Sequence, residues 1–140
     1  MGVPTFIENF QASRLIEPVQ GLSQIAGRAS ALADGRPAAE AYPESVGRTP
    51  EVVPAGSPVV DPPGTWEHAT WRLLSFEWTA EHSYSFTFEQ SKLPGRSVFV
   101  ATANGDLDGD GVLSTFQIAG ECAAGKAPVL HPMEISREVE

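Results

Sequence analysis

The sequence contains a single cysteine, Cys122, so the chain cannot form an internal disulfide. It is also poor in positive charge, because nine Lys and Arg stand against eighteen Asp and Glu, which gives a net charge of -9. Nucleic acids and anionic membrane surfaces would repel such a chain, so neither is an expected partner. No run of eighteen apolar residues occurs, which excludes a membrane span within these residues, and no signal-peptide pattern is present.

Motifs that carry catalysis are lacking as well. The chain has no G-x-S-x-G, H-E-x-x-H or phosphate-binding glycine loop. His68, His82 and His131 show no metal-ligand spacing with one another or with Cys122, and we expect each at the surface or in packing. Cys122 has no basic neighbour in the sequence that would activate its thiol. We therefore expect no enzymatic activity.

The chain of 140 residues is expected to form one domain with three parts. Residues 3–34 are expected to form an N-terminal helix, and residues 35–65 a proline-rich connecting loop. Residues 66–140 carry the alternating pattern of an antiparallel sheet and a C-terminal region. Residues 1–36 hold as many basic as acidic side chains, so the whole negative charge belongs to the rest of the chain.

The first part predicts a long helix from Pro4 to Ala33. Apolar side chains recur there at helical spacing: Phe6, Ile7, Phe10, Ile16, Leu22, Ile25, Ala26, Ala29 and Leu32. Gly35 and Pro37 are stop signals, whereas Pro18 should kink or split the helix. At about 1.5 Å per residue, such a helix is roughly 45 Å long, which exceeds the width of a compact body of this size. Its N-terminal end is therefore expected to project.

Seven prolines between residues 35 and 65 favour an extended loop over a central strand. Beyond it, apolar or alternating runs predict four strands: Trp71–Phe76, His82–Glu89, Ser97–Ala103 and Ser114–Ala119, with a fifth short one near Val129–Ile135. The short connections between them favour an antiparallel meander. The expected fold class is α+β, with one long helix laid across a four-stranded antiparallel sheet.

Three tryptophans, Trp66, Trp71 and Trp78, leave two uses open. Large aromatic side chains of this kind mostly fill a core or a helix–sheet seam. A platform on which a sugar ring stacks is the other use.

The residues from Asn104 to Gly111 join two of the predicted strands. Asp106, Asp108 and Asp110 alternate ahead of a glycine, as in the opening of a D-x-D-x-D-G calcium loop, and the Val112 carbonyl would be the next ligand. The pattern then departs from a full calcium loop, because Gln117 stands where a bidentate Glu is expected. Asp and Gly are also the residues that turns require, so a calcium loop and a solvated turn are both open.

The stretch from Val3 to Arg14 (VPTFIENFQASR) resembles the first helix of type IV pilins and pseudopilins, in the part that follows the membrane-embedded half. The body is similar to a group of bacterial pilin-like proteins in five further segments: Tyr42–Gly47, Trp71–Phe76, Tyr84–Phe86, Gly105–Gly111 and Ser114–Phe116. The leader and hydrophobic stretch that open the family's sequences are not in this chain. We therefore expect an N-terminally truncated, soluble form.

The resemblance implies a structural subunit of a type IV pilus or pilus-like filament with the pilin fold. Phe6, Ile7 and Phe10 would form the assembly interface, and the partners would be copies of this chain and other pilins. The missing segment would hold the subunit in the inner membrane before assembly at the cell surface. Many pilins close a C-terminal loop with a disulfide, which the lone Cys122 cannot form. Some pseudopilins bind calcium in a C-terminal loop instead, which favours the calcium interpretation of the acidic loop.

Two alternatives accompany this expectation. A type II secretion pseudopilin would share the architecture and form a short periplasmic filament, and the genes beside it would be those of an outer-membrane secretion system. A calcium-dependent surface-binding or adhesion module would use the acidic loop and the tryptophans. Its binding to glycans would be sensitive to a chelator.

Overall fold

The computed structural model describes the backbone of residues 2–137 and the side chains of residues 16–136. Its elements, in chain order, are α1 (Gly2–Ala33), the 3-10 turn η1 (Ala38–Glu40), β1 (Val46–Thr49), α2 (Ala69–Leu73), β2 (Tyr84–Leu93), β3 (Arg96–Gly105), β4 (Ser114–Ala123), β5 (Val129–Leu130) and β6 (Glu134–Arg137).

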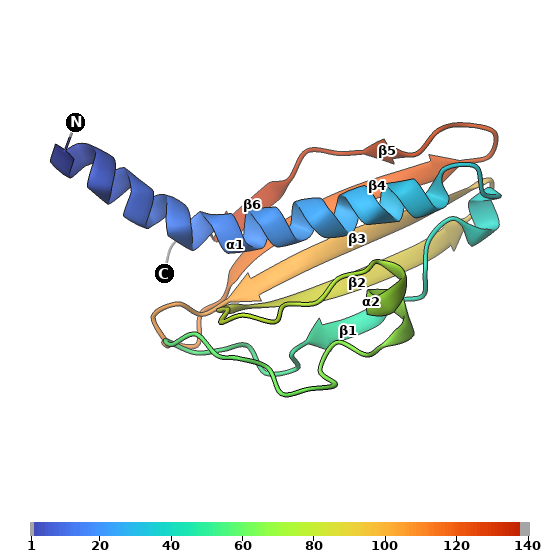
Figure 1. Ribbon diagram of the computed structural model, residues 1–140. Coiled ribbons are helices and arrows are strands. Elements are labelled where there is room, and N and C mark those ends of the chain that lie inside the picture. Colours follow the sequence, from blue (N-terminus) through green and yellow to red (C-terminus); the bar gives the residue numbers. More distant parts are fainter. Residues whose placement is uncertain (1, 138–140) are drawn as a thin grey trace.

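The strands form one antiparallel sheet in the order β1-β2-β3-β4-β5, and β6 also pairs with β4. Its centre is the meander β2–β3–β4, three strands of ten residues each. Helix α1 lies across one face of this sheet, and α2 lies with its flanking segments beside the helix (Figure 1). Three of the four predicted strands therefore pair in sequence order. Strands β3 and β4 extend beyond the predicted residues, whereas β2 begins and ends later than the sequence pattern indicated.

The core lies between the sheet and α1. Alternate residues of β2 point into it, and Tyr84, Phe86 and Phe88 are at most 1% exposed. From the helix side, Leu22 and Ile25 are fully buried, together with alanines one turn apart that let the helix approach closely. Burying each large apolar side chain stabilises the fold by about 1.5–3 kcal/mol.

Close packing at the helix–sheet seam depends on glycine. A Cβ atom placed on Gly21 of α1 would lie 2.5 Å from a ring carbon of Phe86. Within the sheet, Tyr84 covers Gly105, its pairing partner on β3, in the same manner. The aromatic rings therefore occupy space that any larger residue at these positions would need.

The expected four-stranded sheet is wrong. Six strands pair in one sheet, and the side chains of α1 are described only from Ile16 to Ala33. The molecule is thus mostly a six-stranded antiparallel sheet, and it does not fit a long helix packed on a four-stranded one. The three strands outside the expected four, β1, β5 and β6, come from segments in which proline obscured the pattern.

The first of these segments is the proline-rich stretch at residues 35–65. Between Pro43 and Pro50 the chain is free of proline, and there it forms β1, which pairs with β2 at the edge of the sheet. At the other side, Pro132 separates β5 from β6, because proline offers no N–H to the ladder. The single short strand predicted near Val129–Ile135 is therefore two.

The strand predicted at Trp71–Phe76 is also wrong, because this stretch begins within helix α2 and continues into the turn after it. Trp71 and Leu74 are buried whereas Arg72 and Leu73 are exposed, which is the spacing of one helical turn. The His68 Nδ1 atom accepts the Thr70 N–H at 3.0 Å and caps the first turn. A six-residue apolar run is compatible with both structures until its tertiary contacts are known.

Helix α1 is continuous through Pro18, so the expected split does not occur. Its N-terminal turns continue past the edge of the sheet (Figure 1). In the part of the chain that the structure describes, no helix combines the length and apolar character needed to cross a membrane.

We predict opposite effects for two alanine substitutions in α1. Gly21→Ala should lower the free energy of unfolding by about 1–3 kcal/mol, because the new methyl group collides with the Phe86 ring. Gly27→Ala is the matched control, since nothing lies within 4 Å of its Cβ position, and it should raise stability by about 1 kcal/mol. Urea denaturation measures both, and an equal gain in the two variants would contradict the seam described above.

Candidate functional site

The predicted assembly residues Phe6, Ile7 and Phe10 have side chains that lie outside the described residues. Helix α1 can be followed in side-chain detail from Ile16 onward. Ile16 and Val19 are 53% and 38% exposed on its surface, although both are large and apolar.

The two charged residues in the described part of α1 both turn toward the body. The Glu17 carboxylate accepts the backbone N–H of Ser83 at 2.9 Å and that of Tyr84 at 2.7 Å. Arg28 Nη1 donates to the carbonyls of Leu74 at 2.9 Å and Ser75 at 2.5 Å, at the end of α2. All four bonds join α1 to segments that lie more than forty residues away in the chain.

Because these charges are directed inward, the outer face of α1 is uncharged between residues 16 and 31. The exposed residues there are Ile16, Val19, Gln20, Ser23, Gln24, Gly27 and Ala31. This neutral strip, which we call the outer face of α1, contrasts with the net charge of -9 of the whole chain.

A buried cluster of ionisable groups lies beneath the start of this face. The His82 side chain is fully buried, with Nε2 2.6 Å from Asp61 Oδ2 and Nδ1 2.8 Å from the Tyr84 carbonyl. Glu17 Oε2 lies 3.8 Å from the same Nδ1 atom, and the Asp61 oxygen also accepts the Trp66 indole N–H at 2.8 Å. Each nitrogen of the buried His82 ring thus faces an oxygen that can accept a hydrogen bond, one from Asp61 and one from the Tyr84 backbone.

Burial raises the pKa of Glu17 above its usual 4.5, although hydrogen bonds from Ser83 and Tyr84 and the nearby His82 act in the opposite direction. Sequence reasoning missed this cluster, because it predicted only a surface or packing role for His82.

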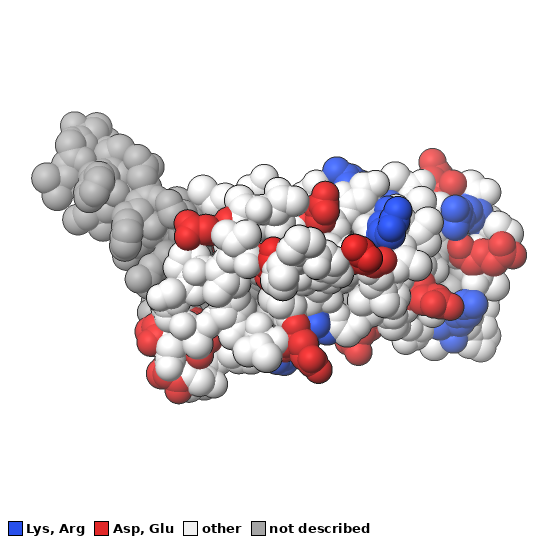
Figure 2. Space-filling view, turned by 60° about the horizontal axis from the view of Figure 1, so that its bottom comes forward, with Lys and Arg blue, Asp and Glu red and all other residues white. Residues whose placement is uncertain are grey.

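The three aspartates of the acidic loop come together. Asp106, Asp108 and Asp110 each offer a carboxylate oxygen, and these oxygens lie within 4.8 Å of one another. Figure 2 shows acidic side chains gathered at this end of the molecule, where β3 passes into β4. Asp106 is 5% exposed, whereas Asp108 and Asp110 are on the surface.

Hydrogen bonds within the acidic loop define its path. Asp106 Oδ2 accepts the Gly111 N–H at 3.0 Å, and Asp110 Oδ1 accepts the Val112 N–H at 2.8 Å. The latter bond is the main cause that lowers the pKa of Asp110. Gly109 and Gly111 both adopt the left-handed backbone that the turn requires.

Gln117, which stands where a calcium loop would carry its last ligand, does not belong to the acidic loop. It lies in β4 and donates to Thr102 on the neighbouring strand at 3.2 Å. The acidic loop therefore connects two strands, and a helix-loop-helix site does not form.

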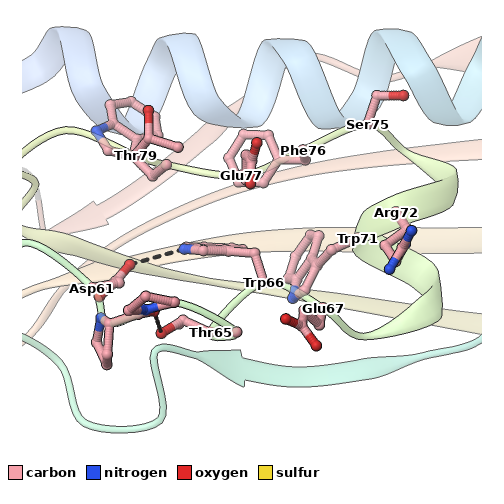
Figure 3. A pocket seen from close by; sticks show the side chains of 14 residues that line it. Asp61, Thr65, Trp66, Glu67, Trp71, Arg72, Ser75, Phe76, Glu77 and Thr79 are labelled. Carbon is pink, nitrogen blue, oxygen red and sulfur yellow. Dashed lines mark hydrogen bonds between the residues drawn. The ribbon is translucent and has the colours of Figure 1, made fainter.

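The tryptophans line a cleft of about 660 Å³ beside α2 (Figure 3). Trp66 and Trp71 are 8% and 0% exposed, and Trp66 packs edge-to-face on Trp71 and Phe76 with ring centroids 5.3 and 5.4 Å apart. Trp78, which is partly buried, stacks on Phe86. The core use is thereby confirmed for Trp66 and Trp71, because their faces are covered by other rings.

The remaining histidines and the cysteine occupy ordinary positions. His68 caps α2, and His131 lies at the surface with Nε2 3.7 Å from Glu121. Cys122 is buried in β4, and its sulfur lies 4.0 Å from the Lys126 carbonyl oxygen.

Comparisons with known proteins give no family for this chain. No protein-family model matches it, and neither a curated protein nor a solved structure matches it. Its function must therefore be inferred from its own residues and their geometry.

We predict that removing the buried imidazole is far more damaging than removing an exposed one. His82→Leu should lower the free energy of unfolding by about 1–3 kcal/mol, because it removes the hydrogen bond between His82 Nε2 and the buried Asp61 side chain. His131→Leu should change it by less than about 0.5 kcal/mol, since the His131 side chain is half exposed. Chemical denaturation near neutral pH measures both, and similar losses would contradict the buried pair.

A second prediction concerns pH. Because the pKa of Glu17 is raised in the folded state, the proton is bound more tightly there than in the unfolded chain. The contribution of this tighter proton binding to the free energy of unfolding is fully present below the unfolded pKa of Glu17 and is lost as the pH rises through its folded pKa. The stability advantage of the native chain over Glu17→Gln should therefore shrink as the pH rises above 4.5, the ordinary pKa of the side chain, as measured by urea denaturation. An advantage that grows with pH would contradict this assignment.

Proposed function

We propose that this chain is a structural subunit of a type IV pilus or pilus-like filament, which assembles through helix α1. The observation that carries the proposal is the uncharged outer face of α1, with Ile16 and Val19 exposed on it. The proposal rests on this helix and on the resemblance of residues 3–14, and it does not depend on the number of strands in the sheet.

A helix face without ionisable groups suits burial against another subunit. Charged side chains at such an interface lose their hydration, which costs several kcal/mol for each ion that stays unpaired. Between residues 16 and 31 of α1 this cost is avoided, because Glu17 and Arg28 already bond to the body of their own subunit. The acidic side chains of the sheet and loops would then face outward from the filament.

The outer face of α1 continues toward the N-terminal residues that resemble the pilin helix. Each Å² of apolar surface that subunits bury there would contribute about 25 cal/mol to assembly. A head-to-tail contact of this kind does not close on itself and so produces a helical filament. A hydrophobic segment upstream would hold the subunit in the inner membrane before assembly.

The proposal predicts that a charge on the outer face blocks assembly without unfolding the subunit. Val19→Lys should remove the protein from the sheared filament fraction of the bacterium that encodes it, because the ammonium cannot be buried unpaired. Val52→Lys is the matched control, since Val52 is 79% exposed in the loop after β1 and should not affect assembly. Immunoblots of sheared and whole-cell fractions, with urea denaturation of both purified variants, make the comparison.

The filament proposal fails if Val19→Lys enters filaments as well as the native chain does. It also fails if the native protein never appears in the sheared fraction under conditions in which the cells produce it.

A further inference from the structure

We propose that the acidic loop between β3 and β4 binds one calcium ion, with the buried Asp106 carboxylate as its anchoring ligand. Two independent observations support this site. The carboxylates of Asp106, Asp108 and Asp110 converge, and the Asp106 Oδ1 atom is buried without any hydrogen-bond partner.

The unpartnered oxygen is the more telling observation. Asp106 Oδ2 accepts the Gly111 N–H, whereas the Oδ1 atom of the same carboxylate accepts no hydrogen bond. A buried acceptor that lacks a donor is costly, and more so when it is charged. Here the neighbouring groups are two further carboxylates, which repel it. A bound cation would pair with the free Asp106 oxygen and would offset the repulsion between the three carboxylates.

The donor set selects the class of ion. Its side-chain ligands are all carboxylate oxygens, which suit hard cations and exclude the softer metals that prefer His and Cys. Calcium tolerates irregular oxygen sites, whereas magnesium demands near-ideal octahedral geometry. Because Gln117 does not supply a bidentate ligand, water and backbone oxygens would complete the shell. We therefore expect a dissociation constant on the order of 10⁻⁴–10⁻³ M, as in extracellular calcium modules.

The site would also secure a second segment of the chain. The Asp106 carbonyl accepts the Gly56 N–H at 2.8 Å, and Ala55 forms an isolated bridge with Asp106. A Cβ placed on Gly109 would lie 3.5 Å from the Gly56 Cα atom, so the two segments are in close contact. A cation that fixes Asp106 would therefore also hold the proline-rich segment against the β3–β4 loop.

Thermal unfolding of chelator-treated protein tests the proposal. Calcium should raise the melting temperature of the native chain by about 5–10 °C at a hundredfold excess over the dissociation constant, through preferential binding to the folded state. Sodium chloride of matched ionic strength should not reproduce this rise, and magnesium should give a smaller one. Hydrogen exchange at the Gly56 amide should slow in parallel.

Asp106→Asn separates a cation site from a turn. Asn retains an acceptor for the Gly111 N–H and supplies a donor amide beside the other carboxylates, so the variant should fold without calcium at least as well as the native chain. It should nevertheless lose the calcium response. Asp108→Asn, which alters an exposed ligand, should weaken calcium binding about tenfold. Glu89→Gln, an exposed acid on β2, is the control and should respond like the native chain.

The proposal is overturned if calcium up to about 10 mM, well above the expected dissociation constant, changes neither the melting temperature nor Gly56 exchange. It is equally overturned if Asp106→Asn and Glu89→Gln respond alike. These measurements need only the folded chain, so their outcome is independent of whether it assembles into filaments.

Discussion

The packing of α1 against the aromatic strands is the interaction on which the rest of the structure depends. Gly21 admits the Phe86 ring, and Leu22 and Ile25 fill the space beside it. The same contact directs Glu17 and Arg28 into the body, where backbone groups from other segments bind them. The outer face of α1 is left uncharged as a direct consequence, and our proposed function follows from that face.

Much of the sheet could be predicted from sequence because its signal is local. Tyr84, Phe86 and Phe88 alternate with small polar residues, which identifies β2, and the turn around Pro94 and Gly95 places β3 after it. The predictions for α2 and β1 failed because tertiary contacts decide which structure these segments adopt. Arg28 binds the Leu74 carbonyl at the end of α2 from 46 residues away in the chain. The six residues of the predicted strand contain no sign of this contact. Strand β1 needed β2 as its partner before its short proline-free stretch could be recognised.

The candidate sites divide in the same way. The acidic loop is contiguous in the chain, so the spacing of its three aspartates in the sequence was enough to predict that they cluster in the fold. The contact between Asp106 and Gly56 and the burial of one carboxylate oxygen could not be foreseen, because they depend on a segment fifty residues earlier. The cluster of His82, Asp61 and Glu17 was missed for the same reason, since each member alone resembles an ordinary surface or packing residue.

The most direct test of the account asks whether the outer face of α1 is covered by neighbouring subunits. Cysteine placed at Ser23 provides the probe, because Ser23 is exposed on that face and the native Cys122 is buried. Maleimide should label Ser23→Cys in the isolated subunit and fail to label it in intact filaments, whereas Val52→Cys should be labelled in both. Equal labelling of Ser23→Cys in subunits and filaments would contradict the account.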